Sequence, residues 1–375
     1  MSSARRDKAK KLRDQTSRRG REDASLVNGL GHRSLASRRN QRPAVYVFGW
    51  PSWLGGADTK LTHLLVLLHH HFSITVVPND APRLRERTWT GFLHKLGVRW
   101  KTLERLPRKL EGIGLSLCND RFFIDRIAHR AKDKGLRIIW SSEMMWHHPG
   151  ELEAVRSGLV DKVLYVSELQ KKALSEGYGT LPGSITGNYV HPPFFPFAER
   201  RHGTFAIGRL SRPDPAKYPE DFPVFYESLE LPESRFRVMA WDEPLRRKYQ
   251  WHHFDERWDL LESEQESQVE FLHSLDLFVY PLGHQFRESW GRSTVEAMLT
   301  GAIPLVPPGH HLENLLVHGE SGYVCHDFLE YQDYARKLWY DYPFRQRLSA
   351  QCREHAEHEL CDAAQHLKTW KEAFQ

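Results

Sequence analysis

Apolar runs alternate with amphipathic stretches from residue 44 onward, and this alternation predicts strands and helices in turn. Residues 44–50 form a short apolar run, residues 59–71 carry leucines at helical spacing, and residues 72–78 form a second apolar run. Strands that alternate with helices are typical of a parallel sheet. Further strands are expected at 98–102, 113–118, 136–141 and 161–167, and further helices at 121–134 and 168–174.

A proline-rich segment separates two such α/β halves. The stretch NYVHPPFFPFAERRHG has prolines at 192, 193 and 196, and such a composition is typical of a linker. After it, the apolar run TFAIGRLS restarts the alternation, and residues 236–241 form another expected strand. Residues 328–374 read as two or three amphipathic helices. The chain is long enough for two domains of ordinary size.

The most informative unit lies in the second half. An apolar strand at 275–280 leads into a polar loop at 281–287, a helix opened by residues 288–291, and an apolar strand at 303–306. This is one βαβ unit of a parallel sheet. Ligands of such sheets bind beyond the carboxyl ends of the strands, which is where the polar loop falls.

Two carboxylates and a glycine give this unit its chemistry. Seven residues separate Glu288 from Glu296, so a helix that begins just before Glu288 places both side chains near one face, roughly two turns apart. A helix N-terminus also presents unpaired N–H groups, which favour an anion beside Gly291. The sequence therefore predicts an anion site flanked by two hydroxyl acceptors, as a nucleotide sugar requires.

The stretch ESWGRSTVEAMLTGAIPLV resembles the E-x7-E helix of retaining GT-B glycosyltransferases, in particular glycosyltransferase family 4, the group 1 glycosyltransferases. The match covers both glutamates, Gly291, the Glu296-Ala297-Met298 step, and Gly301 with Pro304. The resemblance implies a GT-B fold, α/β in class, with two Rossmann-like parallel-sheet domains facing a cleft. The implied divisions are a basic tail (1–43), an acceptor domain (44–190), a linker (191–202), a nucleotide-sugar-binding domain (203–361) and a helix that crosses back to the first domain (362–375).

The same resemblance implies roles for the donor site. Glu288 would bind hydroxyls of the donor sugar and Glu296 those of the ribose, while Ser289 and Gly291 would lie at the pyrophosphate. In GRLSRPDPAKYPEDF, Arg209 and Lys217 match the family's diphosphate-binding cations, although a Pro-Asp-Pro insertion lengthens their spacing and makes Lys217 the weaker candidate. The Gly55-Gly56 turn would face the donor pyrophosphate; taken alone, it is equally consistent with a structural turn.

Candidates for acceptor contact follow the strand at 136–141, in the stretch SSEMMWHHPGE. Glu143, His147 and His148 come after the carboxyl end of that strand, so they are expected to point toward the cleft. His147 is also a candidate catalytic residue. The alternative is a loop whose histidines are merely solvated.

Charge is concentrated at the N-terminus. Residues 1–43 hold thirteen Lys or Arg and four Asp or Glu, whereas the whole chain has a net charge of +5, so the rest is mildly acidic. The tail is expected to be disordered, or to meet anionic lipid or nucleic acid. No apolar run is long enough for a membrane span, and the four cysteines are scattered, so a cytoplasmic protein, peripheral at the membrane at most, is expected.

Metal chemistry is not expected. Adjacent histidines such as those at 69–71 point to different faces of a helix, and the cysteines lack zinc-ligand spacing. The sequence has no D-x-D motif, and the two cations can stabilise a leaving diphosphate. We therefore expect a metal-independent enzyme without a cofactor, which uses a nucleoside diphosphate sugar as co-substrate.

The leading hypothesis is a retaining, hexosyltransferase-like glycosyltransferase that moves a sugar to an acceptor hydroxyl. One alternative is a sugar-nucleotide epimerase of the same fold, which would need no acceptor. Another is a nucleic-acid-binding or DNA-base-glycosylating protein that uses the basic tail. The sequence does not identify the acceptor, the donor sugar or the base.

Overall fold

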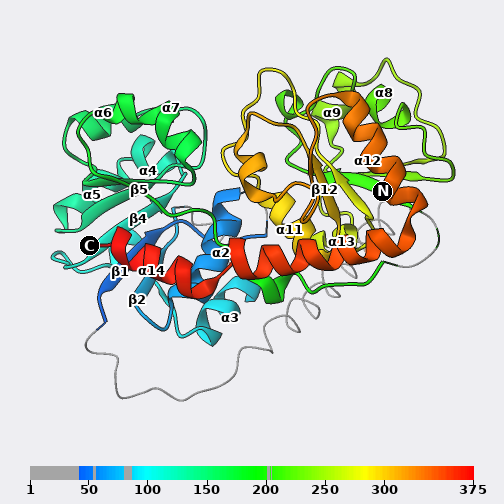
Figure 1. Cartoon of the computed structure of the whole chain (residues 1–375). Coiled ribbons are helices and arrows are strands. Elements are labelled where there is room, and N and C mark those ends of the chain that lie inside the picture. The colour runs from blue at the N-terminus through cyan, green and yellow to red at the C-terminus, as the bar shows by residue number, and fades with distance from the viewer. Residues whose placement is uncertain (1–41, 54–55, 80–86, 201–202, 204) are drawn as a thin grey trace, which may run out of the picture.

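The computed structural model of the chain describes residues 42–53, 56–79, 87–200, 203 and 205–375. Almost all of the basic tail predicted at 1–43 lies outside these residues, as does Gly55. Two parallel α/β halves follow one another along the chain and lie side by side (Figure 1). The predicted fold class is therefore confirmed.

Seven parallel strands form the sheet of the first half, in the order β3-β2-β1-β4-β5-β6-β7. The strand order reverses between β1 and β4, so the loops that follow these two strands diverge there. The strands are β1 Ala44–Phe48, β2 Ser73–Val77, β3 Arg99–Trp100, β4 Ile113–Leu117, β5 Arg137–Ser141, β6 Lys162–Tyr165 and β7 Gly183–Ile185. The helices are α2 Gly56–Leu68, α3 Arg87–Lys95, η3 Leu103–Arg105, α4 Arg121–Ile124, α5 Ile127–Asp133, α6 Glu151–Arg156 and α7 Glu168–Tyr178.

Six parallel strands form the sheet of the second half, in the order β10-β9-β8-β11-β12-β13. Here the order reverses between β8 and β11. The strands are β8 Ala206–Leu210, β9 Arg235–Met239, β10 Trp258–Leu261, β11 Leu277–Val279, β12 Ile303–Val306 and β13 Tyr323–Val324. The helices are η4 Pro192–Phe194, η5 Pro215–Lys217, α8 Phe222–Glu227, α9 Glu243–Lys248, α10 Gln268–His273, α11 Arg292–Thr300, η6 His311–Leu315, α12 Phe328–Tyr340, α13 Tyr342–His355, the π-helical η7 Ala356–Leu360 and α14 Ala363–Ala373.

Helices cover both faces of the first sheet. Apolar side chains of α4, α5, α6 and α7 pack on one face, and those of α2, α3 and α14 pack on the other. This arrangement explains why strands such as β4 (IGLSL) are buried along their whole length. The second of these two cores continues without a break into the second half.

The last helix returns to the first half. The α13–η7–α14 run passes along one side of both halves, and α14 packs against α2 and β7 (Figure 1). The Phe374 ring packs edge-on against the Phe72 ring, with 5.1 Å between the ring centroids. Arg137 of β5 donates hydrogen bonds to the main-chain oxygens of Phe374 and Gln375.

Two predicted helices differ from the structure. The helix expected at 121–134 is divided into α4 and α5, because Arg126 adopts a left-handed conformation (φ 55°). The helix expected from 288–291 begins only at Arg292, because Gly291 has a φ of 95° and interrupts helical geometry. Glu288 therefore lies on the loop before α11, not on the same helix face as Glu296.

Candidate donor and acceptor site

Glu288 and Lys217 meet where the strand order of the second sheet reverses. Lys217 ends η5 in the loop after β8, and Glu288 lies in the loop after β11. Lys217 Nζ donates a 2.9 Å hydrogen bond to Glu288 Oε2, and each side chain is about nine-tenths buried. A parallel α/β sheet binds its ligands in the crevice at such a switch point. This pair therefore lies where a ligand is expected.

Neighbouring groups hold Glu288 in place. Tyr280 donates its hydroxyl to Glu288 Oε2 at 3.1 Å, and the Glu288 N–H donates to His310 Nδ1 at 3.2 Å. Burial alone would raise the pKa of Glu288, but Lys217 and Tyr280 outweigh it and hold this pKa below the usual 4.5. Burial alone would likewise lower the pKa of Lys217, yet Glu288 keeps it above 10.5. Both groups are charged at neutral pH.

The Pro-Asp-Pro segment at 213–215 directly precedes Lys217 and begins the helix that ends with it. The Asp214 side chain accepts a 3.0 Å hydrogen bond from the Ala216 N–H, which caps η5, so the loop ends with Lys217 against Glu288. The insertion that made Lys217 the weaker candidate thus accompanies a direct contact with the first glutamate.

Arg209 lies beneath the loop. Its side chain is fully buried, with the guanidinium 3.9 Å from the Tyr218 ring centroid and 4.2 Å from that of Tyr280. It donates to the main-chain oxygens of Pro281 (2.6 Å) and Lys217 (3.3 Å). In this conformation Arg209 supports the two loops that carry Lys217 and Glu288. Direct contact with a diphosphate stays a prediction, and it requires these loops to move.

Glu296 is more deeply placed than the sequence indicated. It lies on α11 with 2% exposure, and it accepts a hydrogen bond from Arg292 Nε (2.7 Å) and another from Gln268 Nε2. Burial raises the pKa of Glu296, and these two partners oppose that rise. A carboxylate has about four lone-pair positions, so each oxygen keeps capacity for one more donor.

Ser289 connects the two halves. Its hydroxyl donates to the main-chain oxygen of Glu143 at 2.7 Å, and the Ser167 hydroxyl donates to the Ser289 main-chain oxygen at 2.7 Å. Gly291, two residues further, occupies the N-cap position of α11, and no side chain there accepts a hydrogen bond from the first N–H groups of the helix. The loop after β11 therefore touches the loop after β5, and the two sheets present their carboxyl ends to each other.

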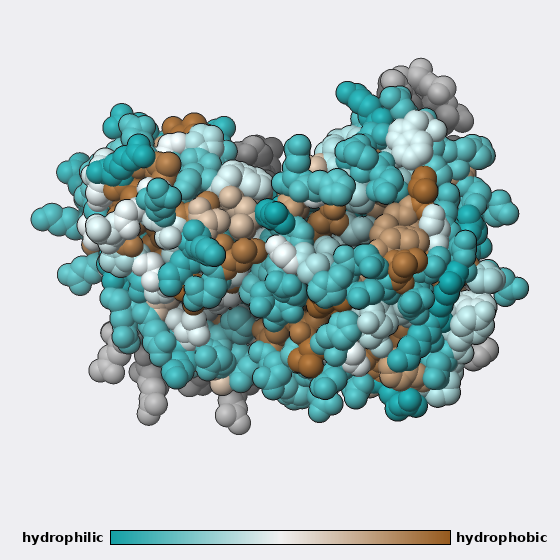
Figure 2. Space-filling model, turned by 45° about the horizontal axis from the view of Figure 1, so that its top comes forward, coloured by the Kyte–Doolittle hydropathy of each residue, from teal (hydrophilic) through white to brown (hydrophobic). Residues whose placement is uncertain are grey.

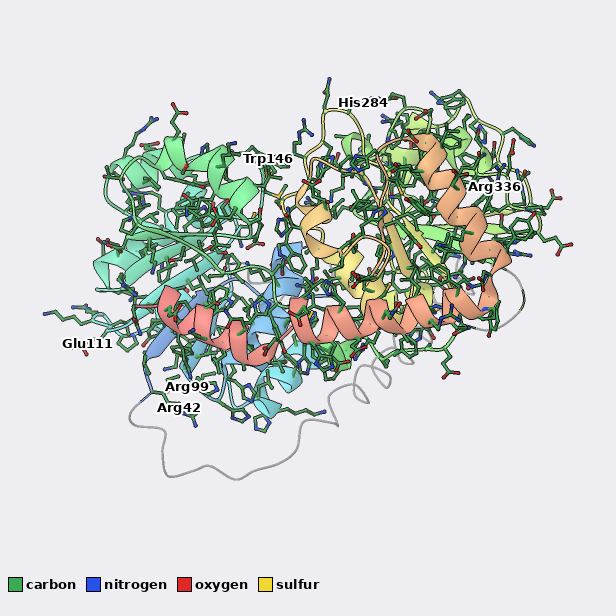
Figure 3. The ribbon with its side chains drawn as sticks, viewed as in Figure 1. Arg42, Arg99, Glu111, Trp146, His284 and Arg336 are labelled. Atoms are coloured by element: carbon green, nitrogen blue, oxygen red, sulfur yellow. The ribbon has the colours of Figure 1, made fainter. Side chains whose placement is uncertain are left out.

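The loop between β5 and α6 carries the predicted acceptor residues. Glu143 Oε1 pairs with Lys60 Nζ of α2 at 2.6 Å, and Trp146 is 46% exposed. Trp146 of the first half and His284 of the second lie on opposite sides of the space between the halves (Figure 3). In the space-filling view a notch separates the two lobes at this end (Figure 2). Gly56 begins α2, which follows β1, so it lies at the same carboxyl end of the first sheet.

His147 and His148 of this loop both contact residues of the first half. The ring of His147 packs edge-on against Tyr178 of α7 at 4.8 Å, and His148 Nε2 lies 3.1 Å from Cys118 Sγ. The fully buried Glu151 accepts hydrogen bonds from the His148 N–H (2.6 Å), Trp140 Nε1 (2.7 Å) and the Tyr178 hydroxyl. These contacts place the His147 ring against α7, so its catalytic role stays a prediction that the contacts do not favour.

Three residues that were not predicted hold the predicted ones. Lys60 pairs with Glu143, Arg292 with Glu296, and Glu151 with the histidine loop. Lys60 is a charged residue within the apolar helix α2, which is the signal that could have identified it. Arg292 follows Gly291 directly within the stretch already quoted.

Neither a metal cluster nor a membrane span is present in the described part of the chain. Within the ranges given above, no three His, Cys, Asp or Glu side chains are close enough together to hold a metal ion. Among the helices described, none is both long enough and apolar enough to cross a bilayer.

No protein-family model and no curated protein sequence matches this chain. Its fold is nevertheless similar to solved structures across most of its length. HepE from Anabaena, solved with UDP and glucose, has a TM-score of 0.67 at 12% identity and covers 88% of this chain and 99% of its own. A glycosyltransferase from Rickettsia africae has a TM-score of 0.65 at 10% identity (89% and 99% covered). Sucrose-phosphate synthase from Thermosynechococcus elongatus has a TM-score of 0.63 at 11% identity (89% and 99% covered). The chain therefore has the GT-B fold.

Proposed function

We propose that this protein is a glycosyltransferase that moves a sugar from a nucleoside diphosphate sugar, UDP-linked in the first instance, to an acceptor hydroxyl with retention of configuration. The Lys217–Glu288 pair at the switch point of the second sheet is the observation that carries this proposal. It offers a cation for a diphosphate and a carboxylate for sugar hydroxyls in one buried contact. HepE, which shares the fold, binds UDP and glucose.

The donor would lie along the loop that precedes α11. Its diphosphate would meet Lys217 and the uncapped N-terminus of α11 beside Ser289 and Gly291, where main-chain N–H groups favour an anion. Its sugar hydroxyls would donate to Glu288, and its ribose to the free lone pairs of Glu296. Lys217 would stabilise the negative charge that develops on the departing diphosphate.

The acceptor would enter from the first half. The main-chain oxygen of Glu143 accepts a hydrogen bond from the Ser289 hydroxyl in the loop before α11, so an acceptor hydroxyl bound at Glu143 would lie near the donor. In a front-face reaction the departing phosphate takes the acceptor's proton, which leaves the protein to position the reactants and stabilise charge. Neither glutamate of α11 and its loop then has to act as a base.

A ligand screen tests the donor half of this proposal. UDP, ADP and GDP are compared for their effect on the melting temperature, since a ligand that binds only the folded protein raises it. We expect UDP to stabilise the wild type and to lose this effect in Lys217→Met. The variant Glu320→Gln, which changes an exposed glutamate of the second half, serves as the control.

Product analysis tests the reaction itself. Incubation with a UDP-sugar and a mixture of acceptors should release UDP, and Glu288→Gln should slow this release about 10- to 100-fold, as expected for the loss of a charged hydrogen bond. Nuclear magnetic resonance of the new glycosidic bond should show the donor's anomeric configuration. Added EDTA should have no effect. An isomerised donor without released UDP would instead indicate an epimerase.

A further inference from the structure

Both halves make hydrogen bonds to residues 188–191, at the start of the proline-rich segment that joins them. From the first half, His63 of α2 accepts the main-chain N–H of His191 on its Nδ1 atom at 2.7 Å. From the second half, Arg292 of α11 donates from Nη1 to the Asn188 side-chain oxygen (2.7 Å) and to the Tyr189 main-chain oxygen (3.3 Å). Residues 188–191, called the crossover segment below, are thus fixed from two sides.

Arg292 also reaches the predicted donor site. Its Nε atom lies 2.7 Å from Glu296 Oε1, so one guanidinium spans Glu296 and the crossover segment. A guanidinium is planar and rigid, and its N–H groups leave in fixed directions. A shift of the carboxylate at one edge therefore changes the hydrogen bonds at the other edge.

Because the contacts of Arg292 are buried, breaking them costs more free energy than breaking exposed ones. The Arg292 side chain is 10% exposed and that of Glu296 is 3% exposed, while Asn188 and Tyr189 are 5% and 2% exposed. Water cannot easily replace a lost partner at such positions, and a buried charge that loses its partner is strongly destabilising. Arg292 Nη2 is already buried without a hydrogen-bond partner among the described residues. Loss of a second hydrogen bond would leave another buried N–H of this guanidinium unpaired.

We infer that Arg292 is a positioning residue that couples donor binding at Glu296 to the placement of the crossover segment, and through it to the angle between the two halves. This inference rests on the proposed function, in which the donor ribose meets Glu296. Ribose hydroxyls that donate to Glu296 would share its charge with Arg292 and weaken the Nε bond. Arg292 would then bind Asn188 and Tyr189 more tightly, so an occupied donor site stiffens the crossover segment.

Coupling between two sites is reciprocal for binding, and this gives the inference a sharp test. Asn188 is changed, because it lies outside the donor site. Asn188→Ala removes the acceptor for Arg292 Nη1, whereas Asn188→Asp keeps an oxygen at the same place. Arg292→Lys serves as a second variant, since an ammonium group cannot bridge both partners as a guanidinium does.

Two measurements are made on each full-length variant. UDP affinity is measured by calorimetry, and the change in distance between the halves on adding UDP is measured by energy transfer between labels at Glu111→Cys and Arg336→Cys, in a Cys118→Ser background. Glu111 is exposed and Arg336 is half-buried at the surface of α12, and the two lie on different halves (Figure 3). We expect Asn188→Ala and Arg292→Lys to weaken UDP binding about 5- to 20-fold and to reduce the distance change, and Asn188→Asp to restore both.

The outcomes separate this inference from the proposed function. A wild type that binds none of the nucleoside diphosphates contradicts the proposed function. A wild type that binds UDP, with an Asn188→Ala variant of equal affinity and equal distance change, overturns the coupling alone. Weaker binding in Asn188→Ala with an unchanged distance change also overturns it, because the crossover segment would then have no part in the motion.

Discussion

Lys60 Nζ lies 2.6 Å from Glu143 Oε1, and this ion pair fastens the loop after β5 to helix α2. The Lys60 side chain is fully buried, and that of Glu143 is 9% exposed. Ser141 also donates its hydroxyl to Glu143 Oε1 at 3.0 Å. The Glu143 carboxylate is therefore held by Lys60 of α2 and Ser141 of β5.

Replacing Lys60 by Met should destabilise the protein by about 3–5 kcal/mol, because it leaves Glu143 buried without a cation. The double variant Lys60→Met/Glu143→Gln should regain at least half of this loss, since the unpaired charge is gone. Urea denaturation of the wild type and both variants measures the free energies of unfolding. Equal stability of the single and double variants would show that the cost comes from lost packing around Lys60, not from charge.

The Lys217–Glu288 pair should stabilise the fold only within a pH window. Glu288 has a lowered pKa, so its contribution is complete above 4.5 and is lost as the pH falls through that lowered pKa. Lys217 has a raised pKa, so its contribution is complete below 10.5 and is lost as the pH rises through that raised pKa. The difference in unfolding free energy between the wild type and Lys217→Met/Glu288→Gln should therefore be constant between about pH 5.5 and 9.5. Outside that plateau the wild type should lose stability relative to the variant. A difference that changes steadily across neutral pH would contradict this assignment.

Gly291→Ala should cost more than Gly319→Ala, although both glycines have a positive φ (95° and 82°). The left-handed conformation itself costs about 1–2 kcal/mol for alanine at either position. A methyl group at residue 291 would also lie 2.2 Å from Leu312 Cδ2, whereas nothing lies within 4 Å of one at residue 319. Leu312 is fully buried, so its side chain would have to shift within a packed core to admit the methyl group. Thermal denaturation of the two variants compares them directly, and equal losses would mean that Leu312 repacks without cost.

Tyr178→Phe should loosen the loop that carries His147 and His148. The change removes a hydroxyl that donates to the fully buried Glu151, and the expected loss is about 1.5–3 kcal/mol. Hydrogen exchange should accelerate at the His148 amide, which donates to the same carboxylate. Tyr165→Phe is the matched control, because no hydrogen bond of the Tyr165 hydroxyl occurs within the described part of the chain. Equal exchange rates in both variants would argue against Glu151 as the support of this loop.

The architecture followed from the sequence wherever strands are apolar along their whole length. Strands such as β4 and β12 are buried on both faces, so their composition alone marks them. Very short strands escaped notice: β7 has three residues and β13 has two, which is too few for any period to show. The start of α11 was misplaced because Gly291 has a φ of 95°, which interrupts the helix and which the local sequence pattern does not indicate.

The sequence predicted some residues of the candidate site but not the contacts between them. The motif identified Glu288, Glu296 and Gly291, since their spacing is local. It could not indicate that Lys217, 71 residues away from Glu288, is the residue that pairs with it. Buried partners on helices, such as Lys60 and Arg292, were not predicted because the strand-end rule points only to the loops that follow strands. Pairing across the chain depends on tertiary packing, which composition and period do not encode.

The return of α14 to the first half affects the order in which the protein can assemble during translation. Helix α14 packs on α2 and β7, and Trp370 is fully buried there, yet the whole second half is synthesised between β7 and α14. The surfaces of α2 and β7 that α14 covers are therefore exposed to water until the second half has emerged. A newly made first half therefore cannot complete its own core alone.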